Sequence, residues 1–166
     1  MKRWLRLRAR QPSVPVLVRE IAPGDRNGLA EVFVAAFAAP PWNESWSRDL
    51  ALAMIDEWRA LPGFVGLVAV REEKIVGLTF GRIERWQRSL IFNLKELCVV
   101  PDCQNRGIAT QLTAALERRL AEHGVARLYL ETLRNSPASA FYARCGYRRD
   151  AAMVLMTKRL DRAGNR

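Results

Sequence analysis

The feature that most constrains the fold is a change of hydrophobic period in the second half of the chain. Residues 90–100 form a long, largely apolar run, which predicts a strand. Residues 107–123 repeat apolar side chains at intervals of three and four, which predicts an amphipathic helix. A further strand is predicted over 125–130. This strand–helix–strand unit predicts a crossover connection within one sheet.

The hydrophobic patterns in the rest of the chain predict further helices and a pair of antiparallel strands. The other predicted elements are a strand over 14–20, a helix from Asp25 to Pro40–Pro41, a helix over 47–60, hairpin strands over 64–70 and 75–84, a short helix starting at Ser136–Pro137 and ending at Cys145–Gly146, and a final strand or strands over 147–160. We therefore predict the α/β class, with a mixed, mostly antiparallel sheet and helices on both faces.

Length and charge narrow the class of protein without fixing its activity. With 166 residues we expect one domain over 14–160, between a basic tail at 1–13 and a short tail at 161–166. The net charge of +10 favours anionic ligands and acidic surfaces. Cys98, Cys103 and Cys145 form neither an even disulfide framework nor a metal-binding spacing. We expect a cytoplasmic protein with no metal, no signal peptide and no membrane span.

The loop between the long strand and the long helix has the properties of an anion-binding site. The first amides of a helix lack internal partners and carry the positive end of its dipole, so they can bind an anion. Gly107 permits close approach of the backbone, and Arg106 adds positive charge. A P-loop is excluded because Gly-Ile-Ala follows in place of Gly-Lys-Ser/Thr, and a dinucleotide fingerprint because two of its three glycines are missing. These residues alone also fit an ordinary strand-to-helix turn.

Two motifs together resemble the GNAT family of N-acetyltransferases. Gln104-Asn105-Arg106-Gly107-Ile108-Ala109 is similar to that family's Gln/Arg-x-x-Gly-x-Gly/Ala pyrophosphate loop, although many members have glycine where this chain has Ala109. The run NSPASAFYARCGY, from Asn135 to Tyr147, resembles the family's second motif. The placement of both motifs among the predicted elements also agrees, and the resemblance spans roughly residues 16–160.

The resemblance implies that acetyl-CoA is the cofactor and that the loop binds its pyrophosphate. The loop residues implied in binding are Gln104, Asn105, Arg106, Gly107, Ile108, Ala109 and Thr110. In this family the fourth and fifth strands splay apart and the pantetheine arm lies between them. The backbone of Val99 and Val100 is therefore expected to bind the arm like an added strand. Asn135 and Tyr142 are expected to contact the cofactor as well.

Acetyl transfer to an amine needs a base for the amine and an acid for the departing thiolate. The resemblance assigns Tyr142 as the acid, while a purely structural role beside Phe141 stays open. Glu96 is the candidate base, because a carboxylate within an apolar strand is expected to have a raised pKa. The alternative for Glu96 is a salt bridge with Lys95 or Arg127.

The segment PWNESW after the first predicted helix is expected to wall the acceptor site, as the corresponding loop does in this family. Aromatic faces and a carboxylate suit a cationic amine. The candidate acceptor residues are Trp42, Asn43, Glu44, Trp46, Glu84 and Trp86. The alternative is that Trp42 and Trp46 pin the loop to the core.

We therefore predict an acetyl-CoA-dependent N-acetyltransferase that acts on a primary amine of a small molecule by direct transfer in a ternary complex. An aminoglycoside-type and a protein N-terminal acetyltransferase are alternatives, and a homodimer stays open. From other classes, a basic nucleic-acid- or ribosome-associated protein and an acyl-CoA-sensing binding protein remain. We do not expect nucleic acid as a partner, because the sequence lacks a basic stripe interleaved with aromatic residues.

Overall fold

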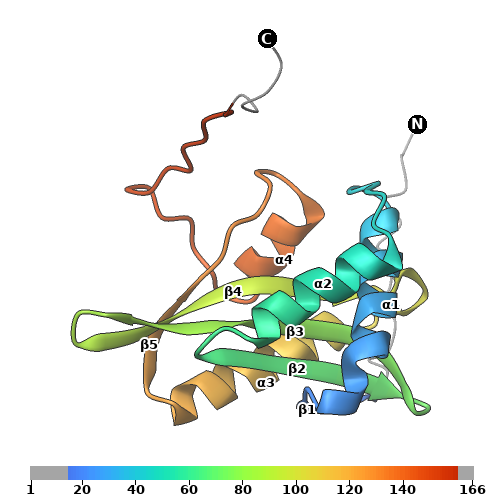
Figure 1. The fold of residues 1–166 in the computed structure, drawn as a ribbon. Coiled ribbons are helices and arrows are strands. Elements are labelled where there is room, and N and C mark those ends of the chain that lie inside the picture. Colours follow the sequence, from blue (N-terminus) through green and yellow to red (C-terminus); the bar gives the residue numbers. More distant parts are fainter. Residues whose placement is uncertain (1–14, 161–166) are drawn as a thin grey trace, which may run out of the picture. The chain divides into compact units, whose positions relative to one another are not determined.

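The computed structural model describes residues 15–160, drawn in colour in Figure 1. The chain divides into two compact units, one ending at Glu131 and the other beginning at Thr132. The predicted tails at 1–13 and 161–166 lie outside the described residues. No helix within the described residues has the length and apolar character needed to span a membrane.

The elements of the first unit follow the predicted order closely. They are β1 (Leu17–Glu20), η1 (Pro23–Asp25), α1 (Arg26–Ala38), α2 (Arg48–Arg59), β2 (Phe64–Arg71), β3 (Lys74–Trp86), β4 (Ser89–Val99), η2 (Pro101–Cys103), α3 (Ile108–Glu122) and β5 (Val125–Tyr129). The helix boundaries have local causes: Ser47 caps α2 through its side chain, which accepts a hydrogen bond from the Leu50 amide.

The five strands form one sheet in the order β1-β2-β3-β4-β5. All neighbours are antiparallel except β4 and β5, which are parallel. The β4–β5 ladder pairs only the residues from Leu90 to Asn93 with β5. Within the described residues, the half of β4 from Leu94 to Val99 therefore has no partner on β5, and the two strands splay as predicted. The predicted fold class is confirmed.

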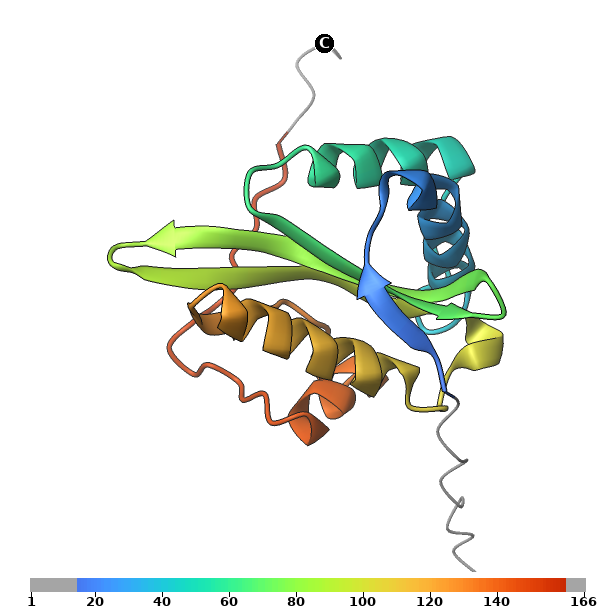
Figure 2. The same cartoon turned by 90° about the horizontal axis from the view of Figure 1, so that it is seen from below.

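Helices cover both faces of this sheet, α1 and α2 on one and α3 on the other (Figure 2). Phe33 of α1 and Ile55 of α2 are almost fully buried together with Leu78 and Phe80 of β3. On the opposite face α3 buries its apolar stripe, which consists of Ile108, Leu112, Leu116 and Leu120. Burial of these stripes is the main stabilising contribution to the first unit.

A β-bulge lies in the middle of β4. Phe80 pairs with Glu96, whereas the next residue on β3, Gly81, pairs with Leu94, so that Lys95 has no partner on β3. Gly81 is required there, because a Cβ at this position would collide with the Asn93 carbonyl. Side chains along a strand point alternately to the two faces of the sheet. The bulge shifts this alternation by one residue in β4 and so decides which of its side chains face α1 and α2.

The second unit contains α4 (Pro137–Arg144). Ser136 caps this helix, since its hydroxyl accepts a hydrogen bond from the Ser139 amide at 3.0 Å, and this agrees with the predicted start. The prediction of a strand or strands over 147–160 is wrong: this segment has no strand. The apolar residues from Met153 to Met156 are exposed, with 86% of Met156 accessible, and a strand forms only where a neighbouring strand supplies hydrogen-bond partners.

Candidate functional site

The loop between β4 and α3 has the backbone geometry of an anion-binding site. It begins with the short helix η2 and ends at Gly107, the N-cap of α3, whose φ of 79° is left-handed. A residue with a Cβ would be strained in this conformation. Because Gly107 brings no capping side chain, the first amides of α3 point out of the helix end without a side-chain cap. The positive end of the helix dipole and the exposed loop therefore meet at one place.

Side chains of the loop brace it and add charge. The Gln104 side chain donates from Nε2 to the Val99 carbonyl at 3.0 Å, which ties the loop to the end of β4. Asn105 also has a left-handed φ of 60°, and Arg106 is partly exposed. Left-handed residues thus lie on both sides of Arg106, immediately before the first turn of α3. These residues fit a pyrophosphate: amides and one cation.

The unpaired half of β4 lies directly before this loop. The Val100 amide donates to the Val76 carbonyl at 3.0 Å, so that side of the chain is occupied by β3. The edge that faces away from β3 is where β5 stops pairing, at Asn93. An extended arm with amide groups can add to such an edge as an extra strand. Loop and edge together suit a long molecule with an anionic middle and an amide-bearing arm.

Glu96 lies on this half of β4, on the face covered by α1 and α2. Its cross-strand partner is Phe80, a residue of the core beneath these helices. Burial raises the pKa of Glu96 to about 7, and the nearby Glu44 carboxylate adds to the rise, whereas the Lys95 ammonium opposes it. Within residues 15–160, no ion pair joins Glu96 to Lys95 or Arg127. The carboxyl group can therefore take up and release a proton near neutral pH.

The loop between α1 and α2 brings Glu44 toward Glu96. The Glu44 amide donates to the Phe37 carbonyl at 2.9 Å, and its carboxylate accepts a hydrogen bond from Trp46 Nε1 at 2.7 Å. The Trp46 ring packs edge-on against Phe33 with 5.0 Å between centroids, and Trp42 lies 5.7 Å from Phe37. Both tryptophans hold the loop on α1 and fix the position of Glu44, and Asn43 is exposed beside them.

Glu84 is in a different state, because its carboxylate is fully engaged. It accepts a hydrogen bond from Arg82 Nε at 2.7 Å and another from the Tyr129 hydroxyl at 3.1 Å. Trp86, two residues further along β3, is 63% exposed near the hairpin end. Tyr129 was not identified from the sequence: it carries no motif, and only the fold brings its hydroxyl to Glu84.

The two remaining predicted residues belong to the second unit. Tyr142 lies on α4, with its ring 5.3 Å from that of Phe141 and 5.3 Å from that of Tyr147. Asn135 precedes α4 with a left-handed φ of 59°, and its side-chain oxygen accepts a hydrogen bond from Arg149 at 3.1 Å. Both residues are therefore held within one short, capped segment.

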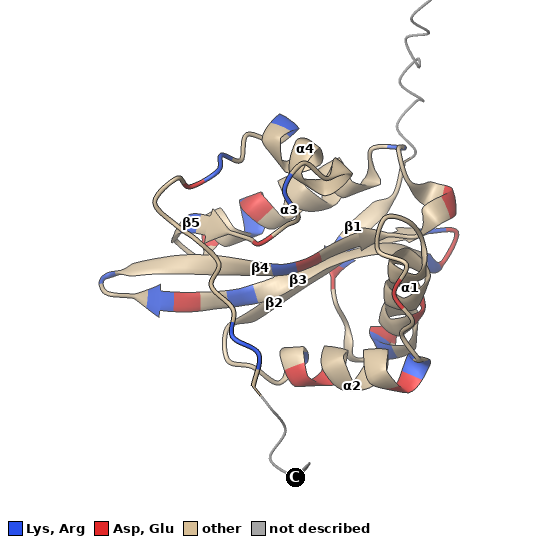
Figure 3. Ribbon diagram, turned by 90° about the horizontal axis from the view of Figure 1, so that it is seen from above, with Lys and Arg blue, Asp and Glu red and all other residues tan. Residues whose placement is uncertain are grey.

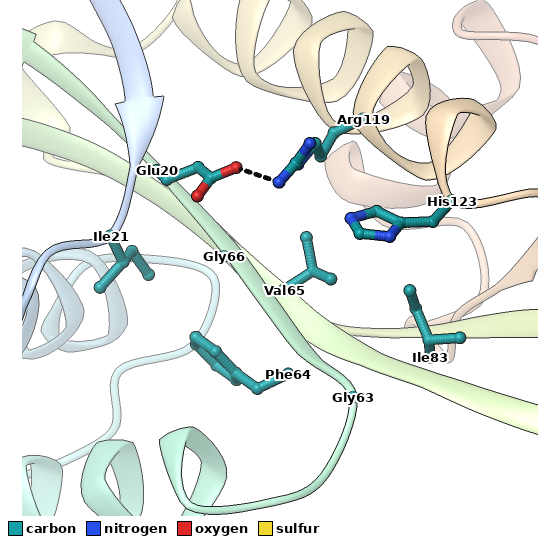
Figure 4. Close-up of a pocket in the computed structure, with 9 residues that line it drawn as sticks. All are labelled: Glu20, Ile21, Gly63, Phe64, Val65, Gly66, Ile83, Arg119 and His123. Carbon is teal, nitrogen blue, oxygen red and sulfur yellow. Dashed lines mark ion pairs between the residues drawn. The ribbon is translucent and has the colours of Figure 1, made fainter.

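A hollow of about 440 Å³ lies elsewhere on the first unit, at the C-terminal end of α3 (Figure 4). It is lined by Glu20, Ile21, Gly63, Phe64, Val65, Gly66, Ile83, Arg119 and His123. The Arg119 guanidinium is bound by Glu20 at 2.7 Å. This hollow shares no residue with the predicted site, and α3 separates it from the loop at Gly107.

Comparison with known proteins identifies the family of this chain. A profile described as the acetyltransferase (GNAT) family matches residues 29–147, which is more than half of the chain. No sequence among the curated proteins matches.

Solved structures share the fold at low sequence identity. One is an aminoglycoside acetyltransferase from an uncultured soil metagenomic sample, in complex with sisomicin: 18% identity, TM-score 0.69, 88% of this chain and 97% of that chain covered. Another is an aminoglycoside N-acetyltransferase in complex with CoA: 18% identity, TM-score 0.66, with 88% and 96% covered. A transcriptional regulator from Bacillus halodurans C-125 has 20% identity and a TM-score of 0.71, with 88% and 100% covered.

Proposed function

The chain belongs to the acetyltransferase (GNAT) family, and on that premise we propose that it transfers the acetyl group of acetyl-CoA to a primary amine of a small molecule. The observation that carries the proposal is the position of Glu96. This carboxyl group, with a pKa raised to about 7 by burial, lies on the same half-strand whose free edge leads into the Gly107 loop. A proton acceptor and a cofactor cradle are thus built on one strand.

The cofactor would be held by the loop and the free edge of β4. The amides from Gly107 to Thr110 and the charge of Arg106 suit the pyrophosphate, and the backbone near Val99 suits the pantetheine arm. When bound, acetyl-CoA supplies the acetyl group as an activated thioester. Asn135 is assigned to the same cofactor by the second motif.

Glu96 would accept the proton of the attacking amine at its carboxylate, directly or through a water molecule. A base works best when its pKa lies near the working pH, because it is then deprotonated yet still a competent proton acceptor. The folded-state pKa of about 7 meets this condition, whereas an exposed glutamate near 4.5 would not. The Tyr142 hydroxyl is assigned to hold a proton for the departing sulfur, on the strength of the second motif.

Direct transfer in a ternary complex is favoured because the nearby thiol is a poor nucleophile. Cys98 lies two residues after Glu96, and burial raises the pKa of its thiol. The thiolate is the reactive form, so a raised pKa argues against an acyl-cysteine intermediate. The acetyl group would therefore pass to the amine without an intermediate on the chain.

The acceptor would enter beside the α1–α2 loop. The exposed Glu44 carboxylate, held by Trp46, offers a partner for an ammonium group next to Glu96. Glu84 is less available because Arg82 neutralises it. Among small amines, aminoglycosides are the first acceptors to try, since two structures of the same fold are aminoglycoside acetyltransferases.

The test is release of CoA thiol from acetyl-CoA across a panel of aminoglycosides, polyamines, amino acids, aryl amines and N-terminal peptides. Tyr142→Phe is assayed beside the wild type, and acetyl-CoA binding is measured for both. We expect amine-dependent release that falls strongly in the variant while binding is retained. Binding without release for any amine would favour a regulatory acyl-CoA-binding role instead.

A further inference from the structure

The bulge in β4 places two adjacent charged side chains on one face of the sheet. In a regular strand Lys95 and Glu96 would point to opposite faces. Here the Lys95 ammonium lies over the Trp58 ring of α2, 5.7 Å from its centroid. Glu96 pairs with Phe80, whose ring lies 6.1 Å from the same tryptophan. Both side chains therefore face α2, and Figure 3 shows the adjacent basic and acidic positions in the middle of β4.

We propose that Lys95 is a positioning residue that acts through Glu96: its ammonium, held over Trp58 by the bulge, sets how readily Glu96 gives up its proton. The catalytic consequence rests on the proposed function, in which Glu96 is the base. The electrostatic effect itself does not depend on any substrate.

Two charged side chains near Glu96 shift its pKa. The other charged side chains of the covering elements are paired with one another, hydrogen-bonded to the backbone or exposed to solvent. The Lys95 ammonium lowers the pKa of Glu96, and the Glu44 carboxylate raises it. The other charged side chains of the covering elements are paired as Arg26 with Asp56, Arg48 with Glu31 and Arg82 with Glu84, while Arg59 donates to the Ala22 carbonyl and Asp49 and Glu57 are exposed. Lys95 and Glu44 therefore form an opposed pair around one carboxyl group.

The cation–π contact explains how an exposed lysine keeps this influence. A lysine side chain on a strand surface normally samples many rotamers, and its effect on a neighbour is averaged and screened. An ammonium within about 6 Å of a tryptophan face is attracted by the negative face of the ring, and this attraction favours one position of the side chain. The Trp58 ring thus fixes the charge beside Glu96.

The experiment follows the Glu96 carboxyl group directly by carbon NMR titration of the full chain with labelled glutamate, assigned by Glu96→Gln. We expect Lys95→Met to move the Glu96 titration to higher pH by about half a unit or more, and Lys95→Arg to restore it. Glu44→Gln should move it to lower pH. Lys74→Met removes the same charge at the exposed β2–β3 turn and should leave the titration unchanged. Trp58→Leu should move the Glu96 titration to higher pH, as Lys95→Met does.

The same variants are then assayed for the pH dependence of kcat/KM. On the acidic side of the profile, kcat/KM should fall with the same pKa that the NMR titration gives for Glu96. Lys95→Met should therefore lose about threefold in kcat/KM below neutral pH. A Glu96 titration that is identical in Lys95→Met and wild type overturns the inference about Lys95. A titration that shifts while the acidic side of the profile stays in place supports the inference and instead contradicts the assignment of Glu96 as the base.

Discussion

Two glutamates on the same face of the sheet are in opposite states. Glu84 on β3 accepts hydrogen bonds from Arg82 at 2.7 Å and from Tyr129 at 3.1 Å. Glu96 on β4 is partly buried and forms no ion pair within the described residues, and its removal from water raises its pKa to about 7. The first carboxylate has a guanidinium and a hydroxyl group as hydrogen-bond partners, whereas the pKa of the second lies near neutral pH.

The difference teaches that hydrogen-bond and ion-pair partners, rather than the face of the sheet, separate the surroundings of the two carboxylates. A carboxylate with a guanidinium partner forms a charge-assisted hydrogen bond that contributes to stability. A buried carboxylate without such a partner weakens the fold when ionised, which is a cost that functional sites commonly carry. Each of the following predictions tests whether the two glutamates differ in this way.

The largest expected effect is on activity. Glu96→Gln should lower kcat/KM by about 100-fold or more at pH 7.5, because removal of a general base costs roughly 10²–10⁴ in rate. Glu84→Gln should change it only a few-fold. Initial rates of amine-dependent CoA release measure both variants. Equal losses in the two would show that the contrast between the glutamates has no catalytic meaning.

The next effect is on the free energy of unfolding. At pH 8 Glu96→Gln should raise it, whereas Glu84→Gln should lower it. Because the folded-state pKa of Glu96 is about 7 and its ordinary value is 4.5, the contribution of Glu96 to stability is fully present below about pH 4.5 and is lost as the pH rises through 7. Glu96→Gln removes this loss, so at pH 8 it should be more stable than the wild type, by at most about 3 kcal/mol. The difference should be much smaller at pH 5.

Urea denaturation at pH 5 and pH 8 measures this comparison, with Glu84→Gln as the matched variant. Glu84→Gln should be less stable than the wild type at both values, because Arg82 and Tyr129 lose their charged partner. A Glu96→Gln variant that is destabilised equally at both values would contradict the raised pKa.

The smallest effect concerns Tyr129. Its pKa is raised by burial and further by its hydrogen bond to the Glu84 carboxylate. Glu84→Gln removes the carboxylate, so the pKa of Tyr129 should fall while the contribution from burial remains. Ultraviolet absorbance of the phenolate during an alkaline titration measures it, with Tyr129→Phe identifying the signal. An unchanged titration would show that the two side chains do not interact in solution.

The sequence predicted those parts of the molecule that depend on local chemistry. Ser136 and Pro137 mark the start of α4, and Ser47 marks that of α2, because capping involves residues three positions apart. The left-handed Gly107 at the start of α3 was recognisable because a few consecutive residues mark it, whereas its assignment to pyrophosphate came from the family resemblance and stays a prediction.

The parts that were missed depend on contacts between distant segments. The bulge at Lys95 arises from the pairing of β3 with β4, and Gly81 within a strand was the one local sign of it. The Tyr129–Glu84 bond joins residues 45 positions apart. The apolar run around Met153 resembled a strand, but β-propensity depends on a partner that the sequence does not show.

The central claim is that the Gly107 end of α3 binds the cofactor, and calorimetric titration of acetyl-CoA into the chain tests it most directly. Gly107→Ala and Gly124→Ala form a matched pair, since they flank the two ends of α3 with φ values of 79° and 71° and carry similar backbone strain. A Cβ at Gly124 would meet no atom within 4 Å. We predict that the wild type and Gly124→Ala bind acetyl-CoA and that Gly107→Ala binds at least tenfold more weakly. No binding by the wild type, or equal weakening in both variants, would contradict the account.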